Sequence, residues 1–150
     1  MVTPTRLGLP PAARLRRPSE FERVYGFRRS AADGSIVVYA CPAAVVDGAT
    51  AAERAVRVRL GLSVSRRVGN AVVRNGWKRR LREAFRLMQG RLPPGQDYIV
   101  VVRPGKMPEG ERGARAVEET LLSLAERIVS RSGYRTASVP AVGYRQPRRR

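Results

Sequence analysis

The sequence predicts an α+β fold, in which helices pack on a small mixed β-sheet to form a two-layer α/β sandwich. Three observations support this fold class. Some segments place their apolar residues at helical spacing. Others alternate apolar and polar residues or are rich in β-branched residues. The two kinds of segment follow one another as helix, two strands, helix, strand, helix. With 150 residues, of which 43% are hydrophobic, the chain is long enough for one domain with a substantial core.

The first helix is expected over residues 19–28. Ser19 is followed three residues later by Glu22, which is the spacing of a capping box at a helix start. Phe21, Val24 and Tyr25 then recur at helical spacing. We therefore expect a short helix that packs one side on the sheet.

Two strands are expected next, over residues 35–41 and 55–65. Both are rich in β-branched residues, and a link containing Asp47-Gly48 joins them, so we expect antiparallel neighbours. Cys41, the single cysteine, is expected to be a buried strand thiol. Without a second cysteine, the chain has neither an internal disulfide nor a CxxC metal or redox motif.

A long helix is expected over residues 71–89, with Gly90 as its end. Its apolar positions form one stripe, which leaves a neighbouring basic face free to bind. The stripe consists of Val73, Trp77, Leu81, Ala84, Phe85 and Met88.

The turn Pro93-Pro94-Gly95 leads into a third strand over residues 97–103. A last amphipathic helix is expected over residues 114–132, and Gly133 is expected to stop it. The inward-facing residues of this helix are Val117, Leu121, Leu124, Ala125 and Ile128.

The organisation is expected to be one folded domain over residues 18–132 between mobile basic tails, residues 1–17 and 133–150. No apolar run approaches the ~20 residues that are needed to span a bilayer. The first residues also lack the apolar stretch of a signal peptide, so we expect a cytoplasmic protein without membrane contact.

The net charge is +18, from 30 Lys and Arg against 12 Asp and Glu. The densest basic run contains no acid and comprises Arg57, Arg59, Arg66, Arg67, Arg74, Lys78, Arg79, Arg80 and Arg82. A solvated helix face normally mixes both signs, whereas here positive side chains repeat four residues apart and repel one another. A polyanion that neutralises them accounts for this pattern, and nucleic acid is the first candidate.

The residue inventory gives little support for catalysis by the protein itself. The absence of histidine excludes Ser-His and Cys-His nucleophiles and imidazole zinc sites. The carboxylates are scattered, with no close pair beside the basic helix that could hold two metal ions for phosphodiester hydrolysis. If this protein takes part in catalysis, another molecule supplies the chemistry.

Aromatic residues form a second candidate site. Phe21 and Tyr25 lie one helical turn apart on the first helix, and Tyr39 lies on the first strand, where the three rings could meet. The residues alone leave two interpretations open. The rings are either an ordinary core cluster or a stacking platform for single-stranded nucleotides.

Residues 60–86 read LGLSVSRRVGNAVVRNGWKRRLREAFR. This stretch resembles the signature of the protein subunit of bacterial ribonuclease P. Arg14-Leu15-Arg16, followed by Glu20-Phe21 and Val24-Tyr25, resembles the N-terminal segment of that family, and residues 97–103 resemble its third main strand. The resemblance covers about residues 14 to 130.

The resemblance implies that a large catalytic RNA removes the 5′ leader of precursor tRNA with bound magnesium, and that this chain is its basic cofactor. Magnesium is then bound mainly through the RNA, no small-molecule cofactor is needed, and the protein alone is expected to cleave nothing. The family fold is ribosomal-protein-like and contains a left-handed βαβ crossover, here residues 55–103, against the usual right-handed preference.

The resemblance also assigns roles by position. Contact with the catalytic RNA falls to Arg66, Arg67, Arg74, Asn75, Lys78, Arg79 and Arg82. The family's cleft for the single-stranded leader corresponds to Phe21, Tyr25, Val37 and Tyr39, with the basic residue Arg59 beside them. The stacking platform is then the favoured interpretation of the aromatic residues.

The central motif departs from the family at one position. Where the family usually reads Arg-Asn-Arg, this chain has Gly76 as the third residue, which costs roughly 1 kcal/mol of helix stability relative to Ala and removes one phosphate-binding side chain. The main alternative function is a ribosomal or RNA-chaperone protein without a role in cleavage. A sequence-specific DNA binder is disfavoured because the candidate recognition helix contains Gly76 and no helix-turn-helix spacing is present.

Overall fold

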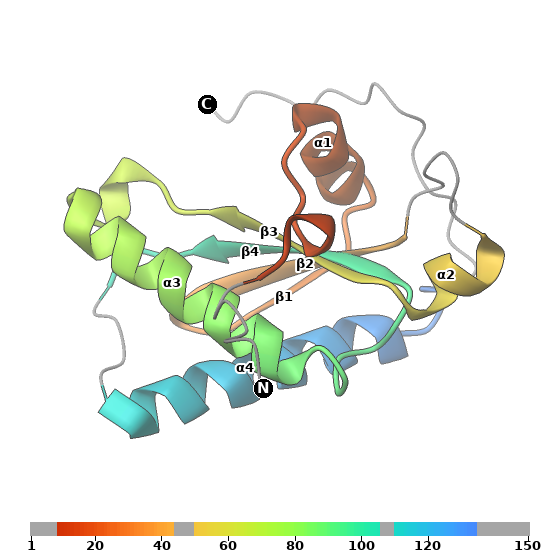
Figure 1. Cartoon of the computed structure of the whole chain (residues 1–150). Helices are drawn as coiled ribbons and strands as arrows, with labels where there is room; N and C mark the ends of the chain where they lie inside the picture. Colours follow the sequence, from red (N-terminus) through yellow and green to blue (C-terminus); the bar gives the residue numbers. More distant parts are fainter. Residues whose placement is uncertain (1–8, 44–49, 106–109, 135–150) are drawn as a thin grey trace, which may run out of the picture.

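The computed structural model describes residues 9–43, 50–105 and 110–134. Within these residues, the centre of the molecule is a four-stranded sheet with the strand order β1-β2-β4-β3 (Figure 1). The strands are β1 Ser30–Ala32, β2 Ile36–Pro42, β3 Val58–Ser63 and β4 Gln96–Val102. Because β2 pairs antiparallel with β1 and β4, whereas β3 and β4 are parallel, the sheet is mixed, as predicted.

Helices cover both faces of this sheet. The helical segments of the described chain are η1 Pro11–Ala13, α1 Pro18–Gly26, α2 Ala51–Val56, η2 Arg66–Val68, α3 Ala71–Met88 and α4 Gly110–Ser130. Figure 1 shows α3 and α4 on one face, while α1 crosses part of the opposite face. The predicted α+β class is confirmed, but the predicted two-layer arrangement is wrong, because helices on both faces of the sheet make three layers.

The connection from β3 through α3 to β4 joins two parallel neighbouring strands. In Figure 1, β3 and β4 both point to the left, α3 lies in front of them, and β4 lies below β3. A right-handed crossover would place the second strand above the first in this view. The crossover is therefore left-handed, in agreement with the family resemblance.

The predicted pairing of the first two long strands is wrong, because β4 lies between β2 and β3. Tyr98, Ile99 and Val100 of β4 are all 0% exposed although successive side chains point to opposite faces. A strand that is buried on both faces favours a central position, and β2 and β3 flank it. The hydrophobic pattern predicts that these strands exist, but their order in the sheet depends on the tertiary fold.

Strand β1 and helix α2 were not predicted. β1 pairs with β2 and forms one edge of the sheet. Helix α2 occupies Ala51–Val56, so β3 begins at Val58 rather than at residue 55. Thr50 caps α2, since its Oγ1 accepts a hydrogen bond from the Glu53 backbone N at 3.1 Å and the Glu53 carboxylate accepts one from the Thr50 N at 2.7 Å.

The start of α1 differs from the prediction by one residue. Pro18 occupies the first turn, where its missing N–H costs nothing. The carboxylate of Glu20 accepts hydrogen bonds from the backbone N of Arg17 at 3.2 Å and of Arg16 at 2.9 Å. Glu20, rather than the pair Ser19 and Glu22, therefore supplies the side chain that stabilises this end of the helix.

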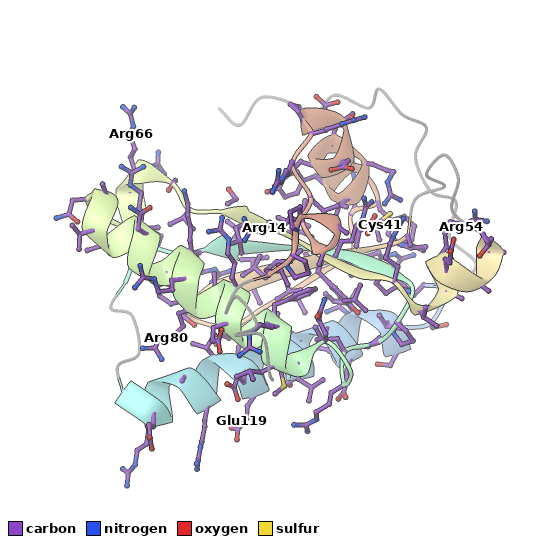
Figure 2. The ribbon with its side chains drawn as sticks, viewed as in Figure 1. Arg14, Cys41, Arg54, Arg66, Arg80 and Glu119 are labelled. Atoms are coloured by element: carbon purple, nitrogen blue, oxygen red, sulfur yellow. The ribbon has the colours of Figure 1, made fainter. Side chains whose placement is uncertain are left out.

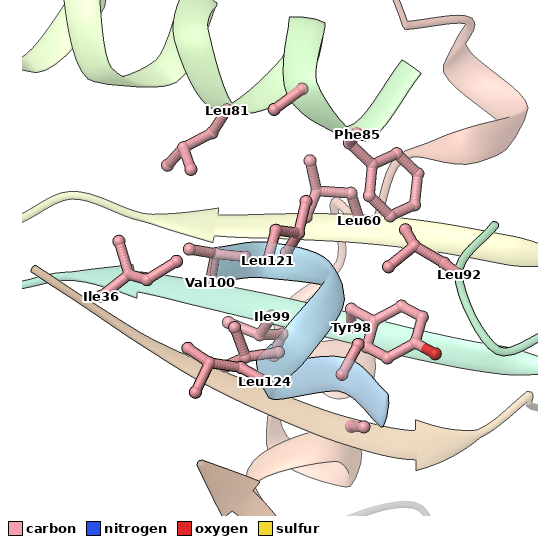
Figure 3. Packing of buried hydrophobic residues seen from close by; sticks show 14 of the residues in the cluster. Ile36, Leu60, Leu81, Phe85, Leu92, Tyr98, Ile99, Val100, Leu121 and Leu124 are labelled. Atoms are coloured by element: carbon pink, nitrogen blue, oxygen red, sulfur yellow. The ribbon is translucent and has the colours of Figure 1, made fainter. Parts of the chain in front are cut away.

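Helix α3 agrees with its predicted range. Asn70 caps its N-terminus, because Oδ1 accepts a hydrogen bond from the Val73 N at 3.0 Å. The predicted stripe is buried from Trp77 onward, whereas Val73 is 37% exposed and lies outside the core. Figure 3 shows Leu81 and Phe85 of α3 and Leu121 and Leu124 of α4 beside the sheet residues Leu60, Tyr98 and Val100.

Parts of both predicted tails belong to the folded domain. Leu9, Ala13 and Leu15 are buried, and the Leu15 N donates to the Leu60 carbonyl at 2.9 Å, so residues 9–17 pack beside β3. At the other end, Tyr134 is 1% exposed, and its ring meets Phe27 edge-on with 5.4 Å between the centroids. Burial of these apolar side chains stabilises the two segments on the domain, although their basic composition predicted mobile tails. Residues 1–8 and 135–150 lie outside the described residues.

No helix in the described ranges is long and apolar enough to cross a membrane.

Cys41 is buried, as predicted, and burial raises its pKa to about 12. We expect the folded protein to react with a disulfide thiol reagent at least about 100-fold more slowly than the chain in denaturant, because the protonated, inaccessible thiol is a poor nucleophile. Similar rates in both conditions would contradict this burial.

The same shift has a consequence at alkaline pH. Because the folded pKa lies above the ordinary thiol pKa of about 8.5, the unfolded chain loses the proton first. This contribution to stability is present below that ordinary value and is lost as the pH rises toward the folded pKa. The variant Cys41→Ala should lack this component of the pH dependence in denaturant titrations.

Candidate nucleic-acid interface

The sheet face that α1 crosses is only partly covered. Register partners on neighbouring strands form three rows across it, namely Arg59-Asp97-Cys41, Gly61-Ile99-Tyr39 and Ser63-Val101-Val37. Side chains of α1 contact the first two rows, whereas members of the third row line an open cleft. The strand register and the length of α1 together decide which residues remain accessible.

Gly61 lets α1 approach the sheet closely. A Cβ atom at this position would lie 2.8 Å from Cζ of Phe21 and 3.2 Å from Cβ of Leu15. The Phe21 ring therefore packs directly over the strand backbone. A larger residue at position 61 would push α1 away and change the cleft beside it.

A buried ion network attaches α1 to the sheet. Asp97 of β4 receives a two-pronged contact from Arg59, with Nε to Oδ1 and Nη2 to Oδ2 both at 2.8 Å. Nη2 of Arg23, from α1, donates to the same carboxylate, while its Nη1 donates to the Pro42 carbonyl at 2.7 Å. Glu20 of α1 accepts a further hydrogen bond from Arg59 at 3.3 Å. These bonds fix α1 at the edge of the cleft.

The network explains why Arg59 remains charged although it is buried. Burial alone lowers its pKa, but the carboxylates of Asp97 and Glu20 outweigh this effect, so the net shift of the Arg59 pKa is upward. Arg59 therefore has a structural role under α1. It does not line the cleft, in contrast to its predicted place there.

The cleft has a volume of about 930 Å³. Its lining residues are Tyr25, Ser30, Ala32, Val37, Tyr39, Ser63, Ser65, Arg67, Val101, Val102, Arg103 and Pro104. The rings of Tyr25 and Tyr39 meet edge to face, with 4.9 Å between centroids and 86° between planes. One part of the lining is thus aromatic, while hydroxyl and guanidinium groups contribute the polar part.

The structure brings together three of the five residues that were predicted for the cleft: Tyr25, Val37 and Tyr39. Phe21 lies 6.4 Å from Tyr25 between ring centroids but packs over Gly61 and lines a different cavity. The serines of the cleft and Arg103 were missed, and Arg67 was assigned to the catalytic RNA, because the strand order that brings these residues to one cleft is not revealed by the strand pattern alone.

The residues predicted to contact the catalytic RNA divide into groups. Arg67 lines the cleft just described. Asn75, Lys78, Arg79 and Arg82 line a second cavity of about 370 Å³, together with Leu9, Arg14 and Glu83. Arg66 and Arg74 line neither of these cavities. Figure 2 shows that Arg66 points outward from the turn before α3.

Gly76 lies on a different side of α3. It lines a groove of about 330 Å³ between α3 and α4, with Arg79, Arg80, Glu83, Ala84, Ala114 and Glu118. Arg80 crosses this groove, since its Nη1 donates to the Gly110 carbonyl at 3.3 Å (Figure 2). A side chain at position 76 would therefore point toward α4 rather than toward Lys78 and Arg82.

The described part of the chain contains no cluster of three carboxylate, cysteine or histidine side chains that could hold a metal ion.

Comparison with known proteins gives consistent results. A family model described as Ribonuclease P matches residues 9–128. The chain is 42% identical to the ribonuclease P protein component of Shouchella clausii over 90 residues, which are 60% of this chain and 66% of that protein. It is 36% identical to the ribonuclease P protein component of Brevibacillus brevis over 114 residues, which are 76% of this chain and 81% of that protein. The solved RNase P protein from Staphylococcus aureus is similar with a TM-score of 0.61 and 29% identity, covering 82% of this chain and 97% of that one.

Proposed function

Since this chain belongs to the ribonuclease P protein family, we propose that it serves as the protein cofactor of a ribonuclease P, which removes the 5′ leader from precursor tRNA. The single observation that carries the proposal beyond the family is the half-covered sheet face, where Tyr25 and Tyr39 border an open cleft beside a basic helix. A single strand and a folded RNA can then be bound on adjoining surfaces.

The cleft suits a single-stranded leader. Every base has a π-face, so aromatic rings such as Tyr25 and Tyr39 bind unpaired nucleotides with little sequence preference. Arg67 and Arg103 are available for the phosphates of the same strand, because their guanidinium groups pair with phosphate oxygens in a two-pronged manner. A duplex would not present its base faces to these rings. The cleft therefore favours precursor tRNA over mature tRNA, which lacks the leader.

The basic side of α3 suits the catalytic RNA. Its residues Asn75, Lys78, Arg79 and Arg82 line one concave surface, and phosphate neutralisation there releases counterions and favours assembly. We place the catalytic centre in the RNA subunit, with magnesium bound mainly by that RNA. The role of the protein is to bind and orient the leader in the cytoplasm, where we expect this particle to act.

Reconstitution with a bacterial catalytic RNA tests the proposal. At a magnesium concentration too low for the RNA alone, the folded protein should restore leader cleavage, because it neutralises phosphates and retains the substrate. The unfolded chain and a basic polypeptide of equal charge are the controls for a charge effect alone. RNA binding without restored cleavage would favour the ribosomal or chaperone alternative, and cleavage by the protein without RNA would overturn the assignment of the catalytic centre.

A further inference from the structure

The segment before α1 runs beside the basic helix rather than away from the domain. Leu15 is buried, and its backbone N donates to the Leu60 carbonyl at 2.9 Å, while Arg14 forms a parallel bridge with Leu60. In an extended segment, the neighbours of an inward-facing residue point the other way. Arg14 is accordingly half-buried and Arg16 exposed, although Leu15 between them is buried.

These two arginines face two cations of α3. Lys78 and Arg82 lie one helical turn apart, and with Arg14 and Arg16 they line a cavity of about 230 Å³. The remaining lining residues are apolar, namely Leu9, Leu15, Phe21, Leu60 and Leu62. Four cationic side chains from two separate parts of the chain thus surround one cavity whose lining includes no carboxylate.

The guanidinium of Arg14 is held in place by the protein itself. Its Nε donates to the Leu9 carbonyl at 2.8 Å, and Leu9 is 2% exposed. This bond connects Arg14 to an anchored backbone, so little side-chain entropy remains to be lost when a ligand binds. Figure 2 shows Arg14 between the N-terminal segment and α3.

Among the described residues, no carboxylate lines the cavity, and the nearby Glu20 is engaged by the backbone N of Arg16 at 2.9 Å and by Arg59 at 3.3 Å. Burial lowers the pKa of Arg82, and the charges of Arg14 and Arg16 lower it further. Glu83, the one carboxylate in the adjoining cavity, is engaged by Arg86 through bonds of 2.6 and 3.1 Å. Because like charges raise the free energy of the folded protein, an anionic ligand would stabilise this arrangement.

We propose that Arg14 and Arg16, together with Lys78 and Arg82, form a binding site for consecutive phosphates of the catalytic RNA. The proposal rests on the function proposed above and adds the N-terminal segment to the RNA surface. The site is continuous with the cavity of Asn75 and Arg79, with which it shares four lining residues, but it shares none with the leader cleft. This continuity favours the catalytic RNA over precursor tRNA as the source of the phosphates.

The test compares Arg14→Gln, Arg16→Gln and the double variant with the wild-type chain. Binding to the catalytic RNA is measured at several salt concentrations. Each substitution should reduce the slope of log affinity against log salt by about one unit, and the double variant by about two, because each arginine neutralises one phosphate. Arg16→Gln is expected to fold normally even if Arg14→Gln does not, since Arg16 is exposed at the surface of the segment.

Matched controls are Arg115→Gln and Arg127→Gln, which remove the same charge from exposed positions of α4. If all four single variants change the slope equally, general attraction explains the effect and the site does not exist. If the loss appears only when the assembled particle binds precursor tRNA, the phosphates belong to the tRNA and the proposal is overturned. Failure of the wild-type chain to restore cleavage would instead contradict the proposed function, so the two failures are distinguishable.

Discussion

Replacing Asp97 by Asn should lower the free energy of unfolding by about 3–5 kcal/mol, because the substitution leaves the guanidinium groups of Arg23 and Arg59 buried without their shared anionic partner. The Asp97 side chain is 0% exposed, and the two arginine side chains are 7% and 8% exposed, so water cannot replace the lost charge. Denaturant titration of the full chain measures the effect.

The matched control is Glu83→Gln, which breaks a single ion pair with Arg86 on the surface of α3. Water and salt already screen that pair, so its loss should be small beside that of Asp97→Asn. Equal losses in the free energy of unfolding would mean that the buried network contributes no more to stability than the surface ion pair. The Asp97 variant should also weaken leader recognition, since α1 carries Tyr25 and is attached through Arg23.

Tyr39→Ala should lower the affinity of the assembled particle for precursor tRNA by roughly 5- to 150-fold, which corresponds to about 1–3 kcal/mol for one stacked base. Tyr39 borders the cleft and meets Tyr25 edge to face, so its removal takes away one ring directly and leaves the other without its neighbour. Affinity for mature tRNA should change little, because that ligand has no leader. Equilibrium binding to both RNAs measures the difference.

The variant Tyr39→Phe provides the control, because it keeps the ring and removes only the hydroxyl. It should retain most of the preference for precursor tRNA. An equal loss of affinity for both RNAs in Tyr39→Ala would identify Tyr39 as a structural residue only. Unfolding measurements on the same variants separate a change in binding from a change in stability.

The aromatic residues illustrate how far sequence reasoning reaches. Helical spacing on α1 and the position of Tyr39 on β2 placed Phe21, Tyr25 and Tyr39 near one another, and the structure confirms this proximity. It also separates them, since Phe21 packs over Gly61 while the two tyrosines line the cleft. That separation depends on how closely the helix approaches the strand, which no local pattern encodes.

The observed placements of Arg59 and Arg14 differ from the predicted ones for a related reason. In the sequence, Arg59 belongs to the dense basic run and Arg14 to a tail, so the first was expected to bind RNA and the second to be mobile. Pairing of β3 with β4 places Arg59 opposite Asp97 under α1. Burial of Leu9 and Leu15 brings Arg14 beside Lys78. Both placements arise from contacts between residues far apart in the chain.

The sequence alone determined the fold class, the family, the range of α3 and its basic face, because these depend on local periodicity and on a long uninterrupted motif. The tertiary structure decided the strand order, the part of the sheet that α1 covers and the partners of the individual arginines. The physical reason is that a charged side chain acts according to its neighbours and its burial, and both are fixed only when distant segments pack together.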